Sequence, residues 1–156
     1  MALKYVEGDL IEMVLKREFD VIVHGCNCFC NMGAGIAKQI AKTFWKAYLA
    51  DMNTEKGDKE KLGTIGIIID LGVIVVNAYT QYGYGKMVRN KPNADYNAIR
   101  SCMKEIRKKV LSINSEYRIG FPLIGAGLAG GDWNIIEKII EEELSDFDIN
   151  IVRFVK

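Results

Sequence analysis

Residues 118–133, RIGFPLIGAGLAGGDW, decide the fold, because an apolar run leads into a cluster of glycines and then into an aspartate before a helical pattern. Residues 20–36, DVIVHGCNCFCNMGAGI, show the same succession of buried strand, glycine-containing turn and helix. Free backbone N–H groups and the positive end of the helix dipole meet at such a junction, and glycine lets a phosphate approach them. The two turns predict two edges of one diphosphate site, although each could instead only pack a helix against the sheet. They comprise Gly33, Ala34, Gly35 and Ile36, and Gly125, Ala126, Gly127, Leu128 and Ala129.

The hydrophobic periodicity predicts an alternation of strands and helices along the whole chain. Leu71-Gly72 separates two β-rich runs and predicts an antiparallel hairpin. The pattern as a whole predicts one domain over residues 1–156, a three-layer α/β/α sandwich with a mixed central sheet of about six strands. A ligand site is expected at the carboxyl ends of the strands. The expected strands are 2–6 at an edge, 20–25, 64–70, 73–79, 118–123 and 149–155; the expected helices are 33–49, 95–111 and 133–144, and 51–63 is expected to be a surface loop.

Composition excludes several classes of protein. The 156 residues are 49% hydrophobic and carry a net charge of +1, so there is no overall basic field typical of a nucleic-acid binder. The longest apolar runs are far too short for a bilayer span, which predicts a cytoplasmic protein without a membrane partner. Cys26, Cys28 and Cys30 lack the C-x-x-C spacing of zinc sites, and His24 is the single histidine. We therefore expect reduced thiols, no metal and no cofactor.

Two familiar nucleotide motifs fail on their context. Residues 125–130, GAGLAG, match the G-x-G-x-x-G fingerprint of dinucleotide-binding domains. That fingerprint should open a βαβ unit with an acidic residue after the next strand and further units beyond, which this sequence does not provide. The Walker pattern is absent, because Gly33 to Lys38 has the wrong spacing and no Ser or Thr follows the lysine.

Five stretches of the sequence resemble the macro domain family, over nearly the whole chain. They are residues 7–10 (EGDL), 21–27 (VIVHGCN), 32–37 (MGAGIA), 77–81 (NAYTQ) and 121–133 (FPLIGAGLAGGDW). The resemblance implies an ADP-ribose pocket with Asp9 and Leu10 in the binding set, where Asp9 accepts a hydrogen bond from the adenine amino group. It also implies that Asn27 contacts the distal ribose and that the two glycine loops enclose the diphosphate.

Departures from the common pattern point to one branch of that family. Residues 24–27 are HGCN where many members have Asn-Ala-Ala-Asn, and Ala129 replaces the usual aromatic. With residues 130–133 (GGDW), they make the chain similar to the branch that includes ADP-ribose 1″-phosphate phosphatases and macro domains that remove ADP-ribose from acidic side chains. In the latter enzymes a lysine attacks the distal ribose, and Lys86 stands near that place. Their acid directly follows Gly-[Ile/Leu], where this chain has Ala129.

His24, Asn27 and Asp132 form the predicted catalytic group. His24 can exchange a proton near neutral pH, Asn27 offers a donor and an acceptor for a ribose hydroxyl, and Asp132 can activate water. The structural alternatives are a core histidine, a turn residue and a helix N-cap. Lys86 and Arg89 follow a loop, 81–85, that could close over a ligand and let them neutralise a terminal phosphate. The alternative for both is a solvated charge.

Two further side chains have open interpretations at this stage. Phe154 can stack on adenine or pack in the core. A nucleophilic Cys26 or Cys28 remains a minor alternative.

The first functional hypothesis is an enzyme that hydrolyses ADP-ribose 1″-phosphate to ADP-ribose and phosphate, with water as the nucleophile and no obligatory metal. Ala129 leaves room beside the distal ribose for that phosphate. One alternative is a hydrolase that removes ADP-ribose from modified acidic side chains, so that an ADP-ribosylated protein would be the partner. The other is a non-catalytic ADP-ribose reader.

Overall fold

A six-stranded mixed sheet forms the middle of the computed structural model, which describes residues 3–85 and 91–155. The strand order is β1-β6-β5-β2-β4-β3. Every adjacent pair is parallel except β3 and β4, so the carboxyl ends of five strands share one edge of the sheet. The predicted α/β sandwich with a mixed sheet is confirmed. The strands are β1 Lys4–Gly8, β2 Val21–Cys26, β3 Ile65–Asp70, β4 Val73–Tyr79, β5 Arg118–Phe121 and β6 Asp148–Phe154.

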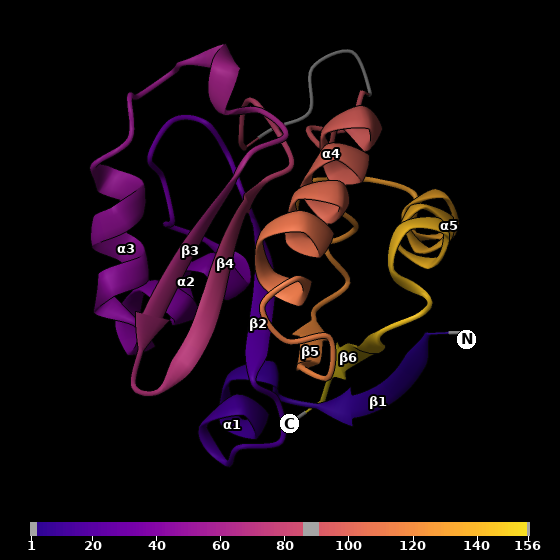
Figure 1. Ribbon diagram of the computed structural model, residues 1–156. Helices are drawn as coiled ribbons and strands as arrows, with labels where there is room; N and C mark the ends of the chain where they lie inside the picture. The colour runs from indigo at the N-terminus through magenta and orange to yellow at the C-terminus, as the bar shows by residue number, and fades with distance from the viewer. Residues whose placement is uncertain (1–2, 86–90, 156) are drawn as a thin grey trace.

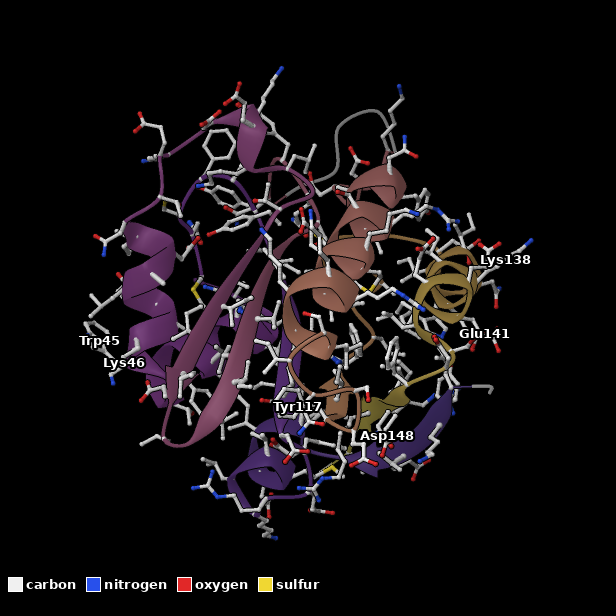
Figure 2. The ribbon with its side chains drawn as sticks, in the orientation of Figure 1. Trp45, Lys46, Tyr117, Lys138, Glu141 and Asp148 are labelled. Carbon is white, nitrogen blue, oxygen red and sulfur yellow. The ribbon has the colours of Figure 1, made fainter. Side chains whose placement is uncertain are left out.

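Helices cover both faces of this sheet (Figure 1). On one face lie α1 (Leu10–Leu15), α2 (Gly35–Thr43) and α3 (Trp45–Met52), which pack on a core that includes Ile22, Val75 and Val152. The other face carries α4 (Tyr96–Ile106) and α5 (Trp133–Leu144) over a larger core. In Figure 2 the labelled Lys138 and Glu141 point outward from α5, while Ile136 and Ile140 are buried beneath it. The apolar side of each amphipathic helix therefore packs against the sheet.

The predicted hairpin is confirmed. Its strands pair in register from Ile65↔Ala78 to Asp70↔Val73. Leu71 and Gly72 have φ values of 52° and 74°, the positive pair that a two-residue hairpin loop requires. The helix expected from Asp95 to Leu111 also has the expected extent, since α4 continues into a π-helical turn, Arg107–Leu111.

Three expectations about local structure are corrected. The single helix expected over 33–49 is two helices, because Phe44 leaves the helical region at φ −116°, ψ 79° and places its ring fully in the core. The short helix α1 was not expected, since six residues show less than two turns of periodicity. The stretch 51–63 is not only a surface loop. Asp51 and Lys61 are buried, and Lys59–Lys61 forms a 3₁₀ turn.

Candidate functional site

A cavity of about 820 Å³ lies along the carboxyl ends of the parallel strands. It runs across the sheet from β1 and β6, past β5 and β2, to the segment after β4. Its lining is contributed by Gly8, Asp9, Leu10, Ile11, Gly25, Asn27, Asn31, Ala34, Gly35, Ile36, Ala37, Gln39, Gln81, Tyr84, Gly85, Pro122, Leu123, Ile124, Gly125, Gly127, Leu128, Ala129, Val152 and Phe154. An extended ligand can therefore contact several strand ends at once.

The β1 and β6 end of the cavity combines a carboxylate with an exposed aromatic ring. Gly8 pairs with Phe154 across these two strands, and Asp9, the residue after Gly8, lines the cavity together with Phe154. Asp9 caps α1, and one of its carboxylate oxygens accepts a hydrogen bond from Glu12 N at 3.1 Å. Phe154 is 68% exposed, so its face is open to a ligand. This end can take a flat heterocycle with an exocyclic amino group.

The two glycine loops meet over the middle of the cavity. A Cβ on Gly35 would lie 3.2 Å from Leu128 Cδ1, so the side chain of the second loop touches the backbone of the first. Gly35 has a φ of +59° and starts α2, and the preceding Ala34 offers no side-chain acceptor to the first free amides of that helix. Unpaired amides at a helix start attract an anion. As expected, the first loop begins a helix.

The second glycine loop does not begin a helix. Helix α5 starts only at Trp133, so Gly125, Gly127 and Leu128 belong to turns several residues upstream. Gly125 has a φ of +75°, and its carbonyl accepts a hydrogen bond from Gly131 N at 2.8 Å, which closes the loop on itself. This loop can offer backbone groups to a ligand, but the expectation that a helix dipole supports it was wrong.

The β2 and β4 end of the cavity is polar and uncharged among its described residues. Asn27 donates from Nδ2 to Asn31 O at 2.7 Å and accepts from Phe29 N at Oδ1 at 2.9 Å. An amide has two donor hydrogens and two acceptor lone pairs, so one of each remains for a ligand. Ala129 is held at this end, because its carbonyl accepts from Ala94 N and Ala94 pairs with Gln81.

Most of the predicted binding residues line this one cavity. They are Asp9, Leu10, Asn27, Ala34, Gly35, Ile36, Gly125, Gly127, Leu128, Ala129 and Phe154. Gly33 and Ala126 lie in the same loops but do not line it. Lys86 and Arg89 lie outside the described residues. The sequence did not lead us to predict that Gly25, Asn31 and residues 122–124 line the cavity. For residues 122–124 there was a signal, because they directly follow the end of strand β5.

His24 does not reach the cavity, so its predicted catalytic role is corrected. It is fully buried, and its Nε2 donates to Asn77 Oδ1 at 2.6 Å, while Asn77 Nδ2 donates to Ala47 O beneath α3. Burial lowers the pKa of His24 to about 4, with the Asn77 hydrogen bond opposing this shift. The imidazole is therefore neutral near pH 7. Adjacent strand residues face opposite sides, and Gly25 lines the cavity instead.

Asp132 also lies away from the cavity lining. Its carboxylate accepts from Asn134 N at 2.9 Å and caps α5, and its own N–H donates to Tyr96 Oη. Of the three predicted catalytic residues, Asn27 alone belongs to the cavity. The structural alternative for Asp132, a helix N-cap, is the arrangement observed.

The cysteines gather around buried side chains rather than around the cavity. Burial raises the pKa of Cys26 and Cys28, which opposes formation of a nucleophilic thiolate. Cys30 Sγ lies 3.7 Å from the Lys61 ammonium nitrogen, in a packed network with Thr54. Within the part of the chain that the structure describes, no group of three or more His, Cys, Asp or Glu side chains could hold a metal ion.

The comparison with family models decides the family. The model described as Macro domain matches residues 23–140, which include most of β2, both glycine loops and most of α5. The chain belongs to the Macro domain family. Within this Macro domain, the matched region contains most of the cavity, whereas Asp9 and Phe154 lie outside it.

Three proteins similar in sequence span almost the same length as this Macro domain. A 17.5 kDa protein of Enterobacteria phage T4, named only by its place in the tk-vs intergenic region, is 38% identical over 97% of this chain and 96% of its own. ADP-ribose glycohydrolase OARD1 of Bos taurus is 28% identical over 94% and 87%. An ADP-ribose 1″-phosphate phosphatase of Debaryomyces hansenii is 26% identical over 96% and 97%.

A solved structure shares the same architecture. A protein of unknown function from Bacteroides thetaiotaomicron superimposes with a TM-score of 0.79 at 27% identity, covering 99% of this Macro domain and 98% of that chain. As for the membrane, no helix among residues 3–85 and 91–155 has the length and apolar character to cross one.

Proposed function

We propose that this Macro domain binds ADP-ribose in its cavity and hydrolyses ADP-ribose 1″-phosphate to ADP-ribose and phosphate. The chemical groups that line the cavity from one end to the other support ADP-ribose as the ligand. A carboxylate and an exposed ring, from Asp9 and Phe154, suit an adenine. The free amides at the start of α2 suit a diphosphate, and the amide of Asn27 suits a ribose hydroxyl. Asp9 follows β1 and Phe154 ends β6, whereas Asn27 and the start of α2 both follow β2, so these groups span the cavity from its β1 and β6 end to its β2 end.

The choice of the phosphatase reaction rests on the absence of acidic side chains among the described residues at the Asn27 end of the cavity. Among the described residues that line the cavity, Asp9 is the one carboxylate, and it lies at the opposite end. A phosphate on the distal ribose brings up to two negative charges. A carboxylate there would repel it, whereas Asn27 and Ala129 do not. The end that receives the distal ribose is therefore compatible with a phosphorylated substrate.

In the proposed reaction water attacks the terminal phosphorus and the bond to the ribose oxygen breaks. Asn27 holds the distal ribose through its remaining donor and acceptor, which fixes the leaving oxygen relative to the phosphate. Burial keeps His24 out of this step, and Asp132 is engaged as a cap. The phosphatase of Debaryomyces hansenii supports this proposal through its 26% identity over almost the whole chain.

A second candidate is removal of ADP-ribose from a modified protein side chain. The similarity to the glycohydrolase of Bos taurus favours it, at 28% identity. Lys86 is the nucleophile that this candidate would use, as the family resemblance implies. Ala129 disfavours it, because no acid follows Gly127-Leu128. Trapping of a covalent adduct on Lys86 with an ADP-ribosylated glutamate peptide would support the second candidate over the first.

The test is a substrate panel on one purified sample, with phosphate release from ADP-ribose 1″-phosphate and ADP-ribose release from the modified peptide measured in parallel. We expect phosphate release by the wild type. Ala129→Asp places a carboxylate at the distal end and is expected to reduce phosphate release at least about tenfold. Ala126→Asp is the matched control, since Ala126 does not line the cavity. Tight ADP-ribose binding without turnover of either substrate would overturn the enzymatic proposal and identify a reader.

A further inference from the structure

A fully buried hydroxyl group next to the cavity-lining Gly25 has no hydrogen-bond partner among the described residues. Thr80 directly follows β4 and is 0% exposed. Its Oγ1 finds no partner among the described residues. A buried hydroxyl without a partner destabilises the folded state, because it gives up its hydrogen bonds to water and regains none. A hydroxyl group that lowers stability in this way indicates a functional role at its position.

Gly25 is what separates this hydroxyl from the cavity. A Cβ on Gly25 would lie 2.6 Å from Thr80 Oγ1 and 3.5 Å from Ile124 Cγ1. Gly25 and Ile124 both line the cavity, as does Gln81, the residue after Thr80. The hydroxyl therefore occupies the space that a side chain at position 25 would need. Gly25 therefore lies directly against the Thr80 hydroxyl and also lines the cavity.

Hydrogen bonds hold the backbone of Thr80 in place, so its hydroxyl does not belong to a loose loop. Its carbonyl accepts from Asp95 N at 2.9 Å, at the N-cap of α4. The next residue, Gln81, pairs with Ala94. Thr64, by contrast, satisfies its hydroxyl by donating to Lys61 O at 2.6 Å. Thr64 is exposed, so the two threonines differ in burial as well as in hydrogen bonding, and the buried hydroxyl of this pair is the one without a described partner.

We propose that Thr80 and Gly25 form a subsite in which the Thr80 hydroxyl hydrogen-bonds an oxygen of the distal ribose. This inference rests on the proposed binding of ADP-ribose. Gly25 is on β2 and Thr80 follows β4, so the subsite lies at the Asn27 end of the cavity. The hydroxyl is closed off in the free protein, and a small shift of the backbone at Gly25 admits the ligand oxygen. Thr80 is a specificity-determining residue that distinguishes ADP-ribose from ADP, which has no distal ribose.

The experiment uses the intact protein and three variants, with thermal unfolding in the absence of ligand and calorimetric titration with ADP-ribose and with ADP. Thr80→Val removes the unpaired hydroxyl at nearly constant volume and is expected to raise Tm by about 2–4 °C. It is expected to weaken ADP-ribose binding about fivefold to tenfold and to leave ADP binding unchanged. Thr80→Ser keeps the hydroxyl and should bind both ligands like the wild type.

Thr64→Val is the control at an exposed threonine, because it removes a hydroxyl that is already paired. It is expected to lower Tm and to leave both affinities unchanged. The subsite is overturned if Thr80→Val binds ADP-ribose as tightly as the wild type, or if it lowers Tm, which would mean that a partner already satisfies the hydroxyl. A wild type that binds neither nucleotide overturns the proposed function and the subsite together. A wild type that binds ADP-ribose, with an unaffected Thr80→Val, overturns the subsite alone.

Discussion

Leu128 Cδ1 lies 3.2 Å from the place that a Cβ on Gly35 would take, so the second glycine loop rests directly on the first turn of α2. Leu128 is 73% exposed, which means that this contact is a thin bridge over the cavity and not part of the core. A ligand beneath the bridge touches both loops. The contact therefore joins two backbone segments that are almost a hundred residues apart, 35 and 128, into one binding surface.

The first prediction concerns the glycine at this bridge. Gly35→Ala is expected to lower the free energy of unfolding by about 1–2 kcal/mol, because alanine is strained at φ +59°. It should also weaken ADP-ribose binding at least about tenfold, since the new methyl group displaces Leu128. Chemical denaturation and calorimetry measure the two effects.

Gly127→Ala separates the contribution of the ligand from that of strain. Gly127 lines the cavity, and a Cβ there would have no atom within 4 Å. The variant should keep wild-type stability and lose affinity, because its methyl group enters the space of the diphosphate. Wild-type affinity in Gly127→Ala would show that the second loop does not contact the ligand.

The second prediction uses Asp9 both as the cap of α1 and as the proposed adenine contact. Asp9→Ser retains an oxygen that can cap α1, so stability should change by less than about 0.5 kcal/mol, whereas Asp9→Ala should lose about 1 kcal/mol. Both variants are expected to bind ADP-ribose about tenfold more weakly. They should also lose the preference for ADP-ribose over the inosine analogue, whose ring offers a carbonyl in place of the amino group. Retained discrimination in Asp9→Ser, measured by competition, would remove Asp9 from adenine recognition.

The third prediction tests the correction at Asp132. As a cap of α5, it should contribute about 1 kcal/mol to stability, which Asp132→Ala loses and Asp132→Ser largely restores. Turnover of ADP-ribose 1″-phosphate at a temperature well below Tm should be unchanged in both variants. A large loss of kcat in Asp132→Ser, with stability preserved, would return Asp132 to the reaction as a base.

The fourth prediction is a dependence of stability on pH that comes from His24. Its pKa is about 4 in the folded protein and near 6.5 when unfolded, so between these values the unfolded chain binds more protons. The stability that the neutral imidazole provides is complete above about pH 6.5 and is lost as the pH falls toward 4. The slope in this window approaches about 1.4 kcal/mol per pH unit.

Comparison of the wild type with His24→Gln isolates this effect. His24 is the single histidine, so the variant removes all imidazole titration, while the buried Asp51 and the ion-paired carboxylates contribute equally to both proteins. The curve of unfolding free energy against pH should be flatter in the variant between 4 and 6.5. Equal slopes in the two proteins would contradict the lowered pKa of His24.

Much of this architecture follows from periodicity, because strands and long helices each expose one repeating face. Helix α5 and the hairpin were predicted for that reason. The break at Phe44 was not, since its ring continues the apolar stripe of α2 and only the tertiary packing shows that the backbone leaves the helix there. An apolar residue at position 44 fits both a continuing helix and a buried core position, but the core position requires a backbone conformation that is not helical.

The site was predicted where it depends on backbone, and less well where it depends on side-chain direction. Asp9 was predicted from the family resemblance, and it lines the cavity. Gly35, Gly125 and Gly127 were predicted from residue type at the ends of strands, and they line the cavity as well. His24 shares that location in the chain, but the alternation of a strand turns it toward Asn77. Thr80 gave no signal, because an unpaired hydroxyl is visible only once every neighbour is placed.

The pairing of β1 with β6 affects how this protein can assemble during synthesis. Residues 4–8 are synthesised well before residues 150–154 and remain without their strand partner until those residues follow. Long-range pairing of this kind is slow to form and favours late completion of the sheet. The β1 and β6 end of the cavity, where we propose that adenine binds, therefore forms after the two glycine loops are already synthesised.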